Sequence, residues 1–158
     1  MDKPTLYMLV GVPGSGKSYW ATNMKDILNF TIFSSDEYRE KLTGNVNDTE
    51  HNNLVFQHLH KDLTNCLQEG HSVCYDATNV KRRDRTRFLK QLKDIDCTKV
   101  AVVIDADEDI IKYQNDNRDR VVPWEVIEKM RDKFVMPSEE EGFDSVTTIQ
   151  KQQQKKNF

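Results

Sequence analysis

Eight residues near the N-terminus have the types and spacing of a phosphate-binding loop. Residues 11–18 read GVPGSGKS and match G-x-x-x-x-G-K-[ST] at every fixed position. Glycines permit backbone angles that are closed to other residues, so successive N–H groups can point at phosphate oxygens. Lys17 can reach the β- and γ-phosphates, and Ser18 can ligate Mg²⁺. The residues expected to bind the nucleotide are Gly14, Ser15, Gly16, Lys17 and Ser18.

The cofactors that this loop predicts are ATP and Mg²⁺. The motif by itself fits ATP or GTP. Nothing in the sequence resembles the Asn/Thr-Lys-x-Asp pattern that reads guanine, and this favours ATP.

Asp36 and Arg39 form a second pair with catalytic potential. Asp36 follows a short apolar run at residues 30–33. A carboxylate at a strand tip can accept the proton of an attacking hydroxyl. Arg39 lies three residues further on, so it shares a helical face with Asp36 and can fork onto a phosphate of the acceptor. The alternative is an N-cap aspartate with a surface arginine.

A third group of polar residues follows the apolar run at residues 72–75. Asp76 can lie beside Mg²⁺ and the γ-phosphate, and Asn79 can cap the next helix. Residues 81–87 carry five positive charges against one negative. This basic run is either a solvated helix face or an attraction for a polyanion.

A polar segment at residues 114–123 has the composition of a lid. It carries Arg118 and Arg120 and ends at Pro123, which opens another helix. Such a segment can bring a guanidinium onto a transferring phosphoryl group. An ordinary connection between two helices is the alternative.

Histidines and cysteines indicate no further site. His58 and His60 are two apart on a helix and do not face together. The three cysteines lack zinc-site spacing and are odd in number, so no disulfide framework is expected. The acidic run at residues 139–141 is expected to be a solvated turn.

The elements that must position these residues alternate between strand and helix patterns. Apolar runs predict strands at residues 5–10, 30–33, 72–75, 100–104 and 145–149. Helices are predicted at residues 17–28, 47–69, 82–94 and 107–115, and from Pro123. This alternation predicts an α/β fold with a central parallel sheet of about five strands flanked by helices. Ligands then lie beyond the carboxyl ends of the strands.

Composition limits the remaining possibilities. The 158 residues suit one domain at residues 1–150, and residues 151–158 are expected to be a frayed polar tail. With 37% hydrophobic and 31% charged residues, the chain is not of the disordered class. No apolar run is long enough for a membrane span, and no signal-peptide pattern is present, so we expect a cytoplasmic protein. A net charge of −3 disfavours a globally basic nucleic-acid binder but leaves room for a local basic face.

In this order, the motifs resemble those of one kinase family. GxPGSGKS, then SSDxYR, then DATN, then NxxRxxxVP is similar to the kinase domain of polynucleotide 5'-hydroxyl kinases of phage and bacterial end-healing enzymes. The resemblance covers residues 5 to about 150. It implies the P-loop NTPase kinase fold and a cytoplasmic DNA- or RNA-repair kinase, acting in the host cytoplasm if phage-encoded. The family's two-domain enzymes add a phosphatase or ligase module, and we expect kinase activity only from this chain.

The resemblance also implies roles for single residues. Asp36 would be the general base that takes the proton of the 5'-hydroxyl, and Arg39 would hold the 3'-phosphate of the terminal nucleotide. Asp76 would support the site on the acceptor side, and Arg118 would be the lid arginine. The family often has another arginine where this chain has Gln114. The expected partners are nucleic-acid 5' ends and a nucleoside triphosphate, with no membrane and no indicated oligomer.

Two other functions remain open. Related P-loop kinases phosphorylate small molecules, or a hydroxymethylated base within DNA. A nucleotide-dependent switch that hydrolyses slowly is a different class, and a general-base aspartate with a lid arginine would be superfluous there.

Overall fold

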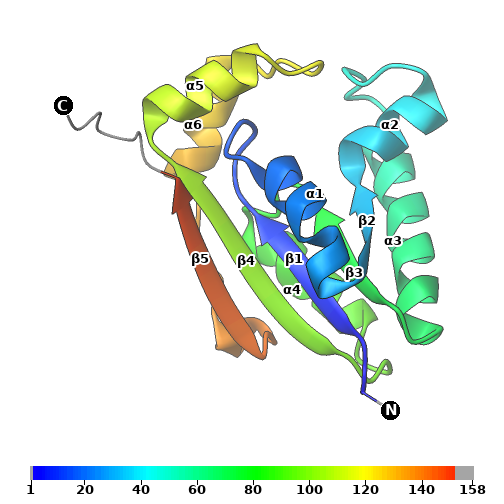
Figure 1. The fold of residues 1–158 in the computed structure, drawn as a ribbon. Coiled ribbons are helices and arrows are strands. Elements are labelled where there is room, and N and C mark those ends of the chain that lie inside the picture. The colour runs from blue at the N-terminus through cyan, green and yellow to red at the C-terminus, as the bar shows by residue number, and fades with distance from the viewer. Residues whose placement is uncertain (1, 152–158) are drawn as a thin grey trace.

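A five-stranded parallel sheet runs through the computed structural model, which describes residues 2–151 (Figure 1). The strands are β1 (Thr5–Val10), β2 (Phe30–Ser34), β3 (Ser72–Asp76), β4 (Thr98–Ala106) and β5 (Ser145–Lys151). Their order across the sheet is β2-β3-β1-β4-β5, and every neighbouring pair is parallel. The prediction of a parallel sheet of about five strands is confirmed.

Continuous apolar runs became strands because both faces of the sheet are covered. In β1, Leu6, Met8, Leu9 and Val10 are fully buried. In a strand that is buried on both faces, apolar residues do not alternate with polar ones. The register places Leu6 beside Val73 of β3 and Lys99 of β4.

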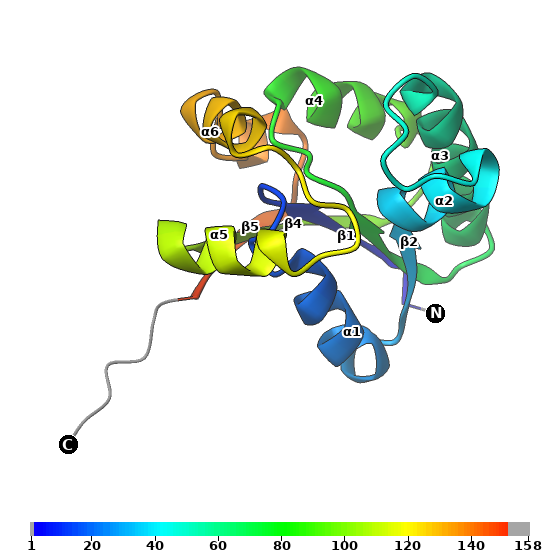
Figure 2. The same cartoon turned by 90° about the horizontal axis from the view of Figure 1, so that it is seen from above.

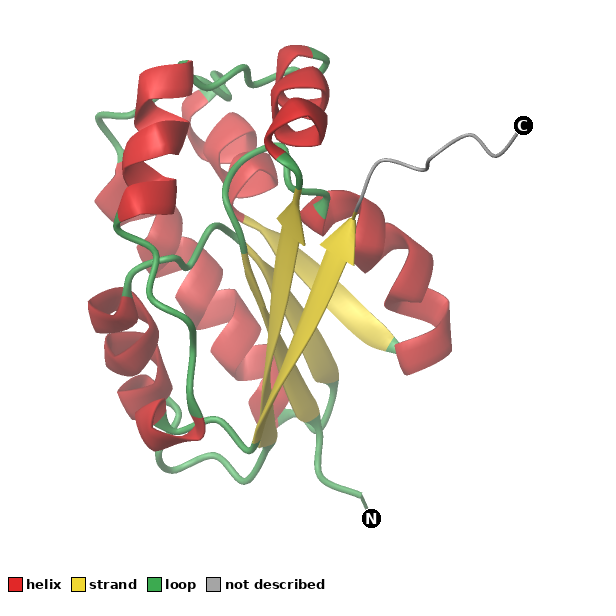
Figure 3. Cartoon of the chain, turned by 90° about the vertical axis from the view of Figure 1, so that its left-hand side faces the viewer, coloured by secondary structure: helices red, strands yellow, loops and turns green. Residues whose placement is uncertain are grey.

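Six α-helices and one 3-10 turn flank the sheet within the described residues. They are α1 (Lys17–Leu28), α2 (Ser35–Thr43), α3 (Asn52–Gln68), α4 (Arg82–Gln91), α5 (Glu108–Asp116), α6 (Trp124–Asp132) and the turn Glu139–Glu141. α1 packs on one face of the sheet, and α3 and α4 pack on the other (Figures 2 and 3). α5 and α6 share a smaller core with Val12 and Val80. Their connection therefore passes over the carboxyl ends of the strands (Figure 2).

One helix start and one helix cap differ from the sequence expectation. The long helix starts at Asn52 rather than near residue 47, because the Asp48 carboxylate accepts the backbone N–H groups of Glu50 and His51 and makes a separate turn. Asn79 does not cap the following helix. It has a positive φ of 47°, and its side-chain amide donates to the Leu9 carbonyl at 2.9 Å, so it ties β3 to β1.

The basic run and the acidic turn each contain one buried residue, Arg85 and Glu141. The expectation that the acidic turn is solvated is therefore wrong for Glu141. Arg85 of α4 is fully buried and forms a fork with Glu141, at 2.7 Å from Nε and 3.1 Å from Nη2. The same guanidinium also donates to the carbonyls of Val80 and Val135. Buried charges persist when every donor is satisfied in this way. Arg85 is thus a structural residue that joins α4 to the C-terminal segment.

The first strand has the predicted bounds of residues 5–10, whereas the C-terminal boundary differs from the expectation. Lys151 belongs to β5, so it is not part of a tail. The rest of the expected tail lies outside the described residues. Within residues 2–151, no helix is both long and apolar enough to cross a membrane.

Candidate nucleotide and acceptor site

The glycine-rich loop joins β1 to α1 and forms the floor of the site. Gly14 and Gly16 have positive φ angles of 85° and 108°, a region that favours glycine. A Cβ at Gly11 would lie 2.4 Å from the Ile104 carbonyl oxygen, so the loop also packs too closely on β4 for a side chain there. α1 begins at Lys17, and its N-terminal N–H groups point toward the loop's concave side.

Lys17 and Ser18 occupy the start of α1 as the motif predicts. The Lys17 ammonium donates to the Val12 carbonyl at 3.0 Å, and burial lowers the pKa of Lys17 to about 8. The Ser18 hydroxyl donates to Asp76 at 2.8 Å. This contact joins the end of β3 to the phosphate loop, so Asp76 lies beside the residue that the motif assigns to Mg²⁺.

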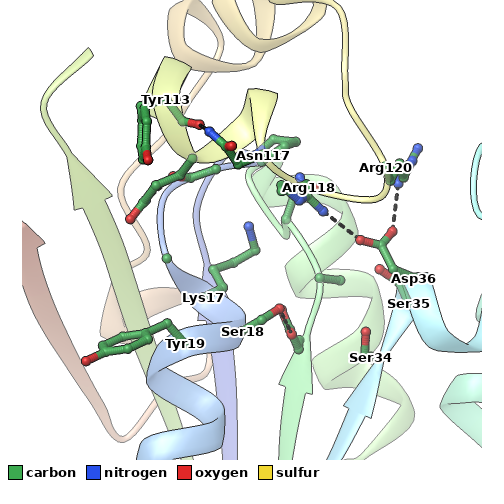
Figure 4. A pocket seen from close by; sticks show the side chains of 17 residues that line it. Lys17, Ser18, Tyr19, Ser34, Ser35, Asp36, Tyr113, Asn117, Arg118 and Arg120 are labelled. Atoms are coloured by element: carbon green, nitrogen blue, oxygen red, sulfur yellow. Dashed lines mark hydrogen bonds and ion pairs between the residues drawn. The ribbon is translucent and has the colours of Figure 1, made fainter. Parts of the chain in front are cut away.

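Asp36 is the centre of a cluster of three arginines, of which Figure 4 shows Arg118 and Arg120. Its Oδ1 accepts from Arg39 and from Arg120, both at 2.9 Å. Its Oδ2 accepts from Arg118 at 2.7 Å. Arg39 comes from the same helix, whereas Arg118 and Arg120 come from the α5–α6 connection. The expected lid is therefore in contact with the expected general base.

These groups surround one cavity of about 330 Å³ at the carboxyl edge of the sheet (Figure 4). Of the residues proposed from sequence, the cavity is lined by Gly14, Gly16, Lys17, Ser18, Asp36, Asp76 and Arg118. Ser15 and Arg39 do not line it. The carboxyl ends of parallel strands are where ligands bind in open α/β sheets.

Arg39 lies behind Asp36, with only 3% of its surface exposed. Its Nη1 donates to Asp36, and its Nη2 donates to Asn52 at 3.1 Å. Within residues 2–151, the buried Arg39 Nε has no hydrogen-bond partner. A buried donor without a partner is costly, so this guanidinium retains capacity for one more acceptor atom.

Two residues without an individual role in the sequence analysis also lie in the site: Gln114, and Arg120, which was expected only as part of the lid. The Gln114 amide donates to the Gly14 carbonyl at 2.5 Å, and its oxygen accepts from Lys151 at 2.9 Å. Arg120 joins Asp36 from 84 residues away in sequence. The signal for both was their place in a polar segment beside the predicted lid arginine.

The residues present fit ATP and Mg²⁺. The loop leaves no room for a Cβ at Gly11, and it leads into the N-terminus of a helix, where free backbone N–H groups bind phosphate. Both features suit a triphosphate. The described residues contain no cluster of three or more His, Cys, Asp or Glu side chains that could hold a metal ion. Mg²⁺ is commonly bound by few protein oxygens together with phosphates and water, and Ser18 with Asp76 provides such oxygens. Bound there, the ion would neutralise phosphate charge.

Comparison with known families agrees with this geometry. A family model described as an AAA domain matches residues 6–137. The chain belongs to this family. The AAA domain here has the α/β P-loop fold, with a five-stranded parallel sheet flanked by six helices in the described residues.

Curated relatives of this AAA domain are much longer than the chain. The 6-phosphofructo-2-kinase/fructose-2,6-bisphosphatase 1 of Rattus norvegicus is 28% identical in an alignment of 112 positions, which covers 59% of this chain and 23% of that protein. A mimivirus protein named "Putative bifunctional polynucleotide phosphatase/kinase" is 24% identical in an alignment of 156 positions, which covers 93% of this chain and 33% of that protein. The chain thus spans a quarter to a third of these relatives.

Solved structures share the fold with this AAA domain. A chain of the Pnkp1/Rnl/Hen1 RNA repair complex superposes with a TM-score of 0.72 at 22% identity, covering 84% of this chain and 44% of that one. A sugar kinase from Janibacter sp. HTCC2649 superposes with a TM-score of 0.67 at 15% identity, covering 93% of this chain and 85% of that one. The fold is therefore shared by a chain of an RNA repair complex and by a sugar kinase.

Proposed function

We propose that this AAA domain is an ATP-dependent kinase that transfers the γ-phosphoryl group to the 5'-hydroxyl of a polynucleotide, DNA or RNA. The observation that carries the proposal is the position of Asp36. Its carboxylate lies in the same cavity as Lys17 and Ser18, and the buried Arg39 lies directly behind it. A base and a phosphate-binding arginine beside a phosphate loop are what a phosphorylated hydroxyl acceptor requires.

The proposed transfer uses residues from three strand ends. Asp36 takes the proton of the acceptor hydroxyl while the hydroxyl oxygen forms a bond to the γ-phosphorus. The bond from the γ-phosphorus to the bridging oxygen breaks, and ADP leaves with that electron pair. Lys17 and Arg118 hold the phosphates during the step, and Ser18 with Asp76 would hold Mg²⁺, which would neutralise phosphate charge.

The charges around the cavity support phosphoryl transfer over slow hydrolysis by a switch. Arg118 and Arg120 reach the base from the lid, whereas Arg39 reaches it from α2. Arg118 has a second buried nitrogen, Nη1, without a partner within residues 2–151. Its positive charge also lies close enough to Lys17 to lower the pKa of that ammonium, after the larger effect of burial. Arg118 is thus within reach of a phosphate held by Lys17.

The role of Arg39 provides the test. Phosphoryl transfer should be measured with 5'-hydroxyl acceptors that carry or lack a 3'-phosphate, in wild type and in Arg39→Ala. A charge-assisted hydrogen bond contributes about 1.5–3 kcal/mol, so the variant should lose about 10- to 150-fold selectively on 3'-phosphorylated acceptors. Lys at this position should rescue only in part, because it lacks the planar fork. The matched control is Arg131→Ala, an exposed arginine on α6.

The possible results separate two roles for Arg39. A selective loss supports a contact with the acceptor phosphate. Equal losses on both acceptors mean that Arg39 only positions Asp36, and the polynucleotide assignment then falls to a kinase of another acceptor. High salt should weaken wild-type activity on oligonucleotides, as expected for phosphate contacts.

A small phosphorylated acceptor is the second candidate. The rat relative is named for a kinase of a phosphorylated sugar, and it matches 59% of this chain at 28% identity. Arg39 could hold such a phosphate equally well. Transfer to a sugar phosphate, with none to any nucleoside 3'-phosphate or oligonucleotide, would favour this candidate.

A further inference from the structure

A second hollow lies between α3 and α4, beside the catalytic cavity. It has a volume of about 280 Å³ and lies on the face of the sheet that these two helices cover. Neither the phosphate loop nor the α5–α6 connection lines it. The chemistry assigned so far makes no use of this hollow.

Aromatic rings form the inner wall of the hollow. The His60 ring lies 4.5 Å from the Phe88 ring and 5.4 Å from the Tyr75 ring, between centroids. Tyr75 and Phe88 are buried, whereas Phe56 and His60 are half-buried and reach the open space. Burial lowers the pKa of His60 to about 4, so the imidazole is neutral at pH 7. The wall thus presents uncharged rings on which a flat group can stack.

The rim of the hollow consists of polar side chains that have no partner within residues 2–151. Asn53, Asp84, Arg87 and Gln91 are exposed and line it. Within residues 2–151, their side chains form no hydrogen bond or ion pair that meets ordinary distance limits. A stacked ring that carries donors and acceptors at its edge would find matching groups here.

The hollow adjoins the site of phosphoryl transfer. Ala77 and Thr78 line both cavities, so the segment after β3 forms a shared wall. A second connection passes through α3. Asn52 accepts from Arg39, and the next residue, Asn53, lines the hollow. The hollow is therefore lined by the sequence neighbour of the residue that accepts from Arg39.

Exposed cations lie along α4, and one of them, Arg87, lines the hollow together with Asp84. Lys81, Arg82 and Arg83 are exposed at the start of α4, and Arg87 lies one turn further on. Arg85, the remaining cation of the run, is turned into the core. The exposed charges lie on a protein whose net charge is −3, so they form a local basic edge. A phosphodiester backbone is complementary to such an edge.

We infer that the α3–α4 hollow is the subsite for the second nucleotide of the acceptor strand. The base stacks on Phe56 and His60, and the phosphodiester lies along the cations of α4. This inference rests on the proposed polynucleotide kinase function and extends it by one nucleotide beyond Arg39. Stacking of one base on aromatic side chains contributes roughly 1–3 kcal/mol, which corresponds to about 5- to 150-fold in affinity.

The test is the preference for a dinucleotide acceptor over a mononucleotide acceptor. Values of kcat/KM should be measured for a 5'-hydroxyl nucleoside 3'-phosphate and for a 5'-hydroxyl dinucleotide with a 3'-terminal phosphate. The dinucleotide should be preferred by about tenfold in wild type. A dinucleotide without its second base should lose most of this preference, because the stacking contact is then missing.

Two variants address the subsite from different sides. Asn53→Trp fills the hollow, and Arg87→Glu reverses a charge on its rim. Both residues are exposed, and circular dichroism checks that each variant folds. The control is Lys25→Glu, which makes the same change in net charge on α1, across the sheet from the hollow. The two hollow variants should reduce the preference toward one, and the control should keep the wild-type preference.

The outcomes for the subsite and for the proposed function are distinguishable. A preference near one in wild type, or an unchanged preference in both hollow variants, overturns the subsite and leaves the kinase proposal standing. Absence of transfer to every nucleotide acceptor overturns both. Loss of preference in the two variants and without the second base, but not in the control, supports the subsite.

Discussion

The Asp36 carboxylate accepts three hydrogen bonds, all from arginines. A carboxylate offers about four acceptor positions on its two oxygens. Oδ1 uses its two positions on Arg39 and Arg120, whereas Oδ2 uses one on Arg118. One position on Oδ2 thus remains for the proton of an incoming hydroxyl. The arginines also fix the orientation of the carboxylate, which suits a base.

Replacement of Asp36 by Asn tests this assignment. General-base catalysis contributes about 100- to 10,000-fold, so the rate of the chemical step should fall by that amount. ATP binding should change little, because Lys17 and Ser18 remain in place. Single-turnover transfer and ATP titration measure the two quantities separately. Near-wild-type turnover would remove Asp36 from the mechanism.

The ammonium of Lys17 predicts a pH dependence of ATP binding. Burial lowers the pKa of this group to about 8 in the ligand-free protein. The charged form that attracts phosphate therefore dominates below pH 8 and is lost above it. Affinity for ATP should fall as the pH rises through 8, by up to about tenfold per pH unit. Calorimetry between pH 6.5 and 9.5 measures this, and Lys17→Met should show a flat, weak profile.

Among the elements, the C-terminal segment depends on one buried ion pair. Arg85 and Glu141 connect α4 to the turn before β5. Removing one member of a buried pair leaves an uncompensated charge and commonly costs about 3–5 kcal/mol. Glu141→Gln should therefore lower the free energy of unfolding by about that amount. Chemical denaturation measures it, and Glu140→Gln at the exposed neighbouring position is the control.

The same elements show what the sequence could predict. β1 and β4 were recognisable because strands buried on both faces are continuously apolar. The phosphate loop was recognisable because its motif is local and has fixed spacing. The burial of Arg85 could not be predicted, because a buried arginine within a basic run looks like its solvated neighbours in the sequence. Its partner also lies 56 residues away. Gln114 and Gly14 meet across 100 residues, which no local pattern encodes.

At the scale of the whole molecule, the parallel sheet collects the site at one edge. The register pairs Ser34 of β2 with Asp76 of β3, so the residues that follow these strand ends are neighbours. The loop after β1 lies next to them, since β1 pairs with β3. Three separate segments therefore converge without a long insertion. This is why strand ends in the sequence were sufficient to find Asp36 and Asp76.

A ligand that contacts all three segments should stabilise the folded molecule. ATP at 100 times its dissociation constant adds about 2.7 kcal/mol to the free energy of unfolding. For a domain near 150 residues this corresponds to a rise in Tm of about 5–10 °C. Differential scanning fluorimetry with ATP and Mg²⁺ measures the shift. Lys17→Ala should remove most of it while keeping the ligand-free Tm, and a full shift in that variant would contradict the loop assignment.

The parallel arrangement also determines how the protein can be labelled or immobilised. β1 starts at the edge of the sheet away from the site, whereas β5 ends at Lys151, whose ammonium contacts Gln114 beside the phosphate loop (Figure 1). A fluorophore or affinity handle placed just ahead of β1 reports on the protein from a distance. A handle attached at Lys151, whose partner Gln114 lines the cavity, would sense, or obstruct, the arrival of nucleotide.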